Sequence, residues 1–223
     1  MIDGIKRKFK GTYTLLVINV VIFLIMTVFG GSTNTYNLIR FGAIVPSAIK
    51  GGELWRLLTS EFIHIGIVHL LMNLLFLIQV GPILESIYGT KNFLKIYLIS
   101  GIMGGLFVFA FDSNNTVSAG ASTSLYGMLG VMIGFLIFHR DDTRLLGLGG
   151  AYVPIILVNA FYTITTPGIS FLGHLGGFVG GLLMTGFVPM LSKNPNSSTI
   201  KGYSSKTIFI LLSIGLLIIG FIF

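Results

Sequence analysis

The chain has 223 residues, of which 53% are hydrophobic and only 9% charged, and its mean hydropathy is +0.92. This composition excludes a soluble globular domain and indicates a polytopic membrane protein, and the absence of cysteine excludes disulfide bonds and thiolate chemistry. The formal net charge of +7 does not indicate a nucleic-acid partner, because the basic residues lie beside apolar runs, where membrane topology explains them.

A short basic segment, residues 1–12, precedes the first apolar run at residues 13–29. This run is too long for a secretory signal peptide and no small-residue cleavage site follows it, so we expect a retained helix. Residues 30–57 then form a half-polar stretch that holds the sole tryptophan, in the sequence ELWR. Its length and its Trp, Arg and Phe content predict a loop that lies in the membrane interface.

Six more apolar runs follow, and each is long enough to cross a bilayer as a helix of about 20 residues. They cover residues 62–81, 93–111, 121–138, 145–162, 171–191 and 205–223. A stretch rich in Ser, Asn and Pro, residues 192–204, predicts a linker before the last run. We therefore predict an all-α membrane protein with seven spans, in which residues 13–191 form a six-helix core and one additional C-terminal helix follows.

The basic residues are distributed unevenly between the two sides of this topology. With a cytoplasmic N-terminus, 11 of the 14 fall on the inner side, namely Lys6, Arg7, Lys8, Lys10, Lys91, Lys95, Arg140, Arg144, Lys193, Lys201 and Lys206. Those left outside are Arg40, Lys50 and Arg56. The excess of basic residues on the inner side predicts that the N-terminus is cytoplasmic and that the second, fourth and sixth spans begin at the outer face.

Polar side chains within spans are costly, which makes each of them a candidate functional group. The second span contains HIGIVHLLMN, with His64, His69 and Asn73, while Ser122 opens the fourth span in GASTSLYG and His174 opens the sixth. His69 and Asn73 are four residues apart and share a helix face, and His64 would lie one and a half turns earlier. Since all three spans start from the outer side, the groups are expected at similar depths.

These groups meet the requirements of a hydrolase with a serine nucleophile. A serine hydroxyl becomes reactive only with a base at hydrogen-bond distance, and the neutral imidazole of His174 is the base that avoids a buried charge at rest. The seven carboxylates fall in loops or at span ends, so we expect a dyad of Ser122 and His174, with the imidazole oriented by packing. His69, Asn73 and the backbone N–H of Ser122 are the expected donors to an oxyanion.

Three further residues are expected to support this pair. Tyr126 lies one turn after Ser122, where its ring can stack against His174. Gly177 and Gly181 come after His174 in the same span and are four residues apart from each other. Two glycines at this spacing allow helix backbones to approach closely.

In this order and spacing the motifs resemble those of the rhomboid family of intramembrane serine proteases. The matching residues are Trp55 and Arg56, His64, His69 and Asn73, Gly81, Pro82 and Glu85, Gly120, Ser122, Tyr126 and Gly127, and His174, Gly177 and Gly181. The resemblance implies a six-helix core in which Ser122 is the nucleophile, His174 the general base, and His69 and Asn73 the oxyanion partners, with Gly120 and His64 in supporting positions. It implies hydrolysis of peptide bonds in or near transmembrane segments, without a metal or cofactor.

Two residues depart from the common pattern of that family. Thr123 directly follows the nucleophile, where Gly is common, and Gly173 precedes the base, where Ala is often found. Thr123 narrows the space beside the oxyanion site but leaves the backbone N–H groups in place, so we expect activity to survive.

Several alternatives stay open at this stage. Ser122 could be a helix N-cap or a small residue for tight packing, whereas Ser124 is a poor rival nucleophile because it lies about 200° around the helix. The chain could be a catalytically silent rhomboid-like binder of membrane proteins. A zinc protease would need an HExxH helix, an aspartyl protease two carboxylates within spans, and a transporter inverted repeats, and the sequence shows none of these. A metal site at His64 and His69 is disfavoured because a helix would place them about 140° apart.

The expected partners follow from this hypothesis. They are transmembrane protein substrates and the lipid bilayer, with no nucleic acid. We expect a multi-pass protein of a bacterial plasma membrane whose active site opens to the outer face, and the sequence leaves the oligomeric state open.

Overall fold

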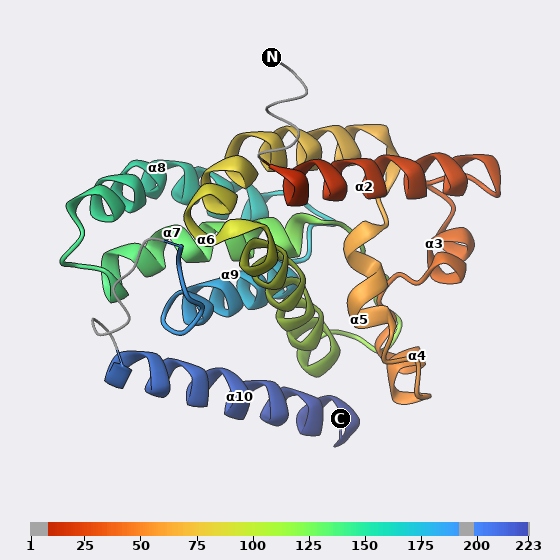
Figure 1. Cartoon of the computed structure of the whole chain (residues 1–223). Coiled ribbons are helices and arrows are strands. Elements are labelled where there is room, and N and C mark those ends of the chain that lie inside the picture. The colour runs from red at the N-terminus through yellow and green to blue at the C-terminus, as the bar shows by residue number, and fades with distance from the viewer. Residues whose placement is uncertain (1–8, 192–198, 223) are drawn as a thin grey trace, which may run out of the picture.

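The computed structural model describes residues 9–191 and 199–222, and every regular element within these ranges is a helix (Figure 1). The elements are α2 (Lys10–Val28), α3 (Thr35–Phe41), α4 (Pro46–Lys50), α5 (Arg56–Thr59), the 3-10 helix η1 (Ser60–Phe62), α6 (Gly66–Phe111), α7 (Ser122–Phe138), α8 (Thr143–Thr165), α9 (Phe171–Thr185) and α10 (Thr199–Ile222). By length and composition α2, α6, α8 and α10 are able to cross a membrane, and α7 and α9 are shorter apolar helices. The prediction of an all-α fold is confirmed, whereas the count of seven spans stays a prediction.

The element α6 joins the second and third predicted spans in 46 residues and breaks at Gly89. At about 1.5 Å per residue, an unbroken helix of this length would be roughly twice as long as the hydrocarbon core is thick. Gly89 has φ +73° and ψ 160°, a conformation that only glycine adopts easily, and the chain turns sharply there (Figure 1). The first half of α6 packs along α2, and the second half packs against α9 and α10.

Some predicted boundaries are wrong by a few residues. Helix α2 begins at Lys10 and not at residue 13, and α9 ends at Thr185 and not at residue 191. Helix α10 begins at Thr199, so the later part of the predicted linker 192–204 is helical, while residues 1–8 and 192–198 lie outside the described residues. The division into segments stays a prediction.

The stretch predicted as an interfacial loop, residues 30–57, contains the short helices α3 and α4 and the start of α5. Arg56 stabilises this stretch, because its side chain is buried and forms an ion pair with Glu53. Its guanidinium also donates to the carbonyls of Ile39 and Ala43, at 2.7 and 2.9 Å. A buried guanidinium with partners in three separate parts of the stretch fixes the path of the chain up to η1.

Helices α7 and α9 pack closely, and this packing brings together their N-terminal ends, which carry Ser122 and His174. A Cβ atom on Gly177 would lie 2.0 Å from the carbonyl oxygen of Thr123, and one on Gly181 would lie 1.8 Å from that of Gly127. The backbones of the two helices are therefore in direct contact, which only glycine permits. As a result the first turn of α7 and the first turn of α9 lie side by side.

Candidate active site

The hydroxyl of Ser122 and the imidazole of His174 are in hydrogen-bond contact, with 2.9 Å between Oγ and Nε2. Gly120 approaches with φ +139°, Ala121 is the N-cap residue, and Ser122 is the first residue of α7. Ala121 offers no side-chain cap, and the Ser122 hydroxyl is directed to His174, so the alternative that Ser122 is an N-cap is wrong. His174 is buried.

A chain of hydrogen bonds continues from the other nitrogen of His174. Its Nδ1 lies 2.9 Å from Oγ1 of Thr163, and the Thr163 hydroxyl contacts the hydroxyl of Tyr126. The Tyr126 hydroxyl in turn donates to the backbone carbonyl of Asn159 at 2.7 Å.

The end of this chain sets its direction, because a backbone carbonyl can only accept. The Tyr126 hydrogen is used on Asn159, so the Tyr126 oxygen accepts from Thr163, and the Thr163 oxygen accepts from Nδ1–H of His174. The neutral imidazole then carries its proton on Nδ1 and leaves Nε2 free to accept from Ser122. The network thus selects the tautomer that a general base needs.

The ring of Tyr126 stacks on the imidazole of His174, with 3.9 Å between the ring centroids and 14° between the planes. The sequence pointed to this contact. It did not predict the hydrogen bond between Thr163 and His174, because packing alone was expected to orient the imidazole. Thr163 lies one residue beyond the predicted run 145–162, although α8 extends to Thr165 and includes it, so it was not among the polar residues singled out within spans.

His69 lies against the turn that carries Ser122. The point where Gly120 would bear a Cβ atom is 2.9 Å from Nε2 of His69 and 3.5 Å from Oγ of Ser122, so a side chain there would collide with the imidazole. Nδ1 of His69 accepts the backbone N–H of Ile65 at 3.4 Å, which leaves the proton of a neutral ring on Nε2. A donor therefore faces the same small space as the Ser122 hydroxyl.

The placement of Asn73 and His64 departs from the sequence-based picture. The Asn73 amide donates to the carbonyl of His69, one turn earlier on its own helix, at 2.7 Å. His64 precedes α6 and is not helical, so the prediction that it lies one and a half turns before His69 is wrong. Its Nε2 accepts the backbone N–H of Ala121 at 3.4 Å, and its ring centroid is 5.3 Å from that of His69. The roles assigned to these residues stay predictions.

The two departures from the family pattern fit each other in space. A Cβ atom on Gly173 would lie 3.0 Å from the Thr123 methyl group, closer than nearly all real contacts. The larger residue after Ser122 thus uses space that the smaller residue before His174 leaves free.

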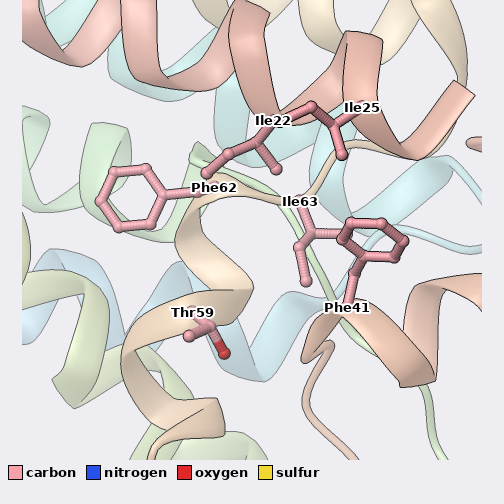
Figure 2. A pocket seen from close by; sticks show the side chains of 6 residues that line it. All are labelled: Ile22, Ile25, Phe41, Thr59, Phe62 and Ile63. Atoms are coloured by element: carbon pink, nitrogen blue, oxygen red, sulfur yellow. The ribbon is translucent and has the colours of Figure 1, made fainter. Parts of the chain in front are cut away.

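An apolar pocket of ≈ 150 Å³ lies away from this site, between α2 and the stretch before α6 (Figure 2). Its lining is Ile22, Ile25, Phe41, Thr59, Phe62 and Ile63. The Thr59 hydroxyl donates to the carbonyl of Gly42 at 2.8 Å and is not available for chemistry. Among the described residues no group of three or more His, Cys, Asp or Glu side chains could hold a metal ion.

His139 follows α7 and is only 5% exposed, and its Nε2 lies 3.2 Å from the carbonyl oxygen of Thr185.

Comparison with known proteins gives a consistent result. Residues 51–190 match the model of the Rhomboid domain. Over 210 residues the chain is 36% identical to the Rhomboid protease GluP of Bacillus subtilis, covering 94% of this chain and 40% of that protein. It is 32% identical over 148 residues to Rhomboid-like protease 2 of Toxoplasma gondii, covering 65% and 51% of the two chains. It is 36% identical over 155 residues to RHOMBOID-like protein 4 of Arabidopsis thaliana, covering 67% and 38%. The chain therefore spans about half or less of the length of these relatives.

Proposed function

Because the chain belongs to the rhomboid family, we propose that it is an intramembrane serine endopeptidase that cleaves membrane proteins with a dyad of Ser122 and His174. The observation that carries this proposal is the 2.9 Å contact between Ser122 Oγ and His174 Nε2. The hydrogen-bond chain behind His174 supports it, because it leaves Nε2 as the acceptor.

The reaction proceeds through an acyl-enzyme. His174 Nε2 takes the hydroxyl proton as Ser122 Oγ bonds to the scissile carbonyl carbon, and the carbonyl oxygen becomes an oxyanion. His174 then gives the proton to the leaving amine as the C–N bond breaks. Water, deprotonated by the same imidazole, attacks the ester and releases Ser122 with its proton restored.

The oxyanion is stabilised by donors around the first turn of α7. The Ser122 backbone N–H is one of the unpaired N–H groups at a helix N-terminus, where the helix dipole favours negative charge. His69 Nε2–H is the second donor, and the remaining hydrogen of the Asn73 amide is the third. Loss of one such donor lowers turnover by about 10²- to 10³-fold in well-studied hydrolases.

The length of α7 supports a site recessed below the membrane surface. Its 17 residues extend over about 25 Å, compared with about 30 Å for the hydrocarbon core. If Phe138 lies at the inner border, Ser122 lies about 5 Å below the outer border. A substrate helix must unwind to present its carbonyl there, so we expect cleavage near small or helix-breaking residues close to the outer end of a transmembrane segment.

The same proposal includes the topology. Division of α6 at Gly89 gives seven spans. The N-terminus is then cytoplasmic, and the site opens to the outer face of a plasma membrane. The likeness to the protein from Bacillus subtilis favours a bacterial membrane.

The proposal is tested by reconstituting the purified protein into liposomes with a single-span substrate that carries Gly and Pro near the outer end of its span. We expect two fragments whose new terminus maps to that end, and less cleavage of a matched substrate with an unbroken Leu span. A stable complex with uncut substrate would instead identify a silent binder.

Thr163→Val is expected to lower kcat about 10-fold with little change in KM, because one orienting hydrogen bond of His174 is lost while the shape is kept. Thr163→Ser keeps the hydroxyl and should retain most of the activity. Full activity in Thr163→Val together with a loss in Thr163→Ser, measured in the same liposome assay, would show that the methyl group and not the hydrogen bond matters.

A further inference from the structure

A second buried polar pair lies directly behind the serine turn. Glu61, in η1, is 1% exposed, and its Oε2 accepts a hydrogen bond of 2.8 Å from the hydroxyl of Ser124, which is 0% exposed. Ser124 follows Ser122 by two residues in the first turn of α7. The other carboxyl oxygen, Oε1, is buried and has no hydrogen-bond partner among the described residues. Neither the Glu61 nor the Ser124 side chain takes part in the proposed catalytic steps.

The residues around the Glu61 carboxyl leave space for it. Tyr97 of α6 lies beside the pair, and Asn19 of α2 lies next to Tyr97; both residues are fully buried. A Cβ atom on Gly101 would lie 2.3 Å from Cδ of Glu61 and 2.3 Å from Oγ of Ser124, so the contact exists only because residue 101 is glycine. Burial of a carboxyl group costs free energy unless its polar atoms are hydrogen-bonded, which makes the bond from Ser124 important for this site.

Among the described residues, the Glu61 carboxyl has no cationic partner. The two ion pairs of the described part of the chain are Arg56 with Glu53 and Arg144 with Asp142. Burial raises the pKa of Glu61 well above its ordinary value, and the hydrogen bond from Ser124 opposes this shift only in part. The carboxyl therefore keeps its proton at pH values where an exposed one is ionised, and a neutral glutamine is its closest mimic.

Residues 60–64, the clamp segment, contact residues 120–124, the serine turn, at three points. The Gly120 N–H donates to the carbonyl of Ser60 at 2.9 Å, and the Ala121 N–H donates to His64 at 3.4 Å. Both contacts lie before Ser122, whereas the Glu61–Ser124 bond lies after it. Helix α7 has no side-chain N-cap, so this bond adds a side-chain contact on the far side of its first turn, beside the backbone contact of Thr123 with Gly177.

Because these contacts lie on both sides of Ser122, we infer that Glu61 and Ser124 form a positioning pair. Their hydrogen bond sets the rotation of the first turn of α7, and this rotation directs the Ser122 hydroxyl toward His174 and the substrate carbonyl. This role rests on the proposed function of Ser122. Neither residue touches the reacting atoms, so both act through the placement of the nucleophile.

The experiment compares Glu61→Ala, Ser124→Ala, the double variant and Glu61→Gln in proteoliposomes. It measures the rate at which a fluorophosphonate phosphonylates Ser122, kcat and KM for the single-span substrate, and the unfolding temperature. We expect each alanine variant to be phosphonylated about 10-fold more slowly and to show a similar fall in kcat with KM unchanged, since a small misplacement of reacting groups is sufficient for such a loss. The double variant should be no slower than the slower single variant, because one contact is removed in each case. Glu61→Gln should stay within about threefold of the unaltered protein, because its amide can still accept from Ser124.

Glu85→Ala is the matched control. Glu85 is also buried and accepts hydrogen bonds from Gly11, Thr12 and Thr90, away from the serine turn. Glu85→Ala should lower the unfolding temperature and leave the phosphonylation rate of the folded protein unchanged. If Glu61→Ala behaves in this same way, or if the losses in the double variant multiply, the positioning role is overturned. Labelling that persists in Ser122→Ala would instead contradict the proposed function, which separates the two failures.

Discussion

Cleavage of a single-span substrate is expected to fall by at least about 10³-fold in Ser122→Ala and in His174→Ala, and to fall no further when both changes are combined. In the proposed mechanism the two groups act as one unit across the 2.9 Å contact, because Ser122 supplies the nucleophile and His174 the base that activates it. The measurement is the initial rate of fragment formation in proteoliposomes, normalised to folded protein.

Ser213→Ala is the control for the serine substitution. Ser213 lies in α10 and donates only to the carbonyl of Phe209 in its own helix, at 2.8 Å. Its rate should equal that of the unaltered protein. A double variant of Ser122 and His174 that is much slower than either single variant would show that the residues contribute independently and do not form a dyad.

The second large effect is expected for Gly181→Ala, which places a methyl group between two helix backbones. The new Cβ would lie 1.8 Å from the carbonyl oxygen of Gly127, and real contacts of this kind essentially never fall below 3.0 Å. No rotamer change relieves the clash, so α7 and α9 must separate by ~1 Å, and a displacement of that size can cost about 10²-fold in rate. The cleavage rate and the unfolding temperature are measured together.

Gly215→Ala provides the matched control, because a Cβ atom there meets nothing within 4 Å. It should leave both cleavage and unfolding unchanged or raise the unfolding temperature slightly, as expected for alanine in a helix interior. If Gly181→Ala retained full activity, the direct backbone contact between α7 and α9 would not be needed to bring Ser122 to His174.

The sequence predicted the helical class and the residues around the serine because these leave local signatures. Apolar runs mark helices, and the costly polar groups at Ser122, His69 and His174 stand out against them. The close approach of α7 and α9 was also readable, since Gly177 and Gly181 recur at the spacing of one helix face.

What the sequence did not predict depends on contacts between distant segments. Glu61 was assigned to a loop or span end because carboxylates avoid apolar surroundings, yet the glycine at position 101, forty residues later, opens a buried site for it. His64 was placed on a helix because the apolar period continues through it, but α6 begins only at Gly66. The partner of His174, Thr163, comes from α8, and no spacing within one helix reveals such a pair.

In the proposed mechanism His174 activates the hydroxyl of Ser122 and of no other serine. The most direct measurement is to label the reconstituted protein with a fluorophosphonate and to locate the adduct by peptide mass spectrometry. We expect a single adduct on Ser122 that is absent in Ser122→Ala and nearly absent in His174→Ala. An adduct on Ser124, or labelling of Ser122 that does not depend on His174, would contradict the account.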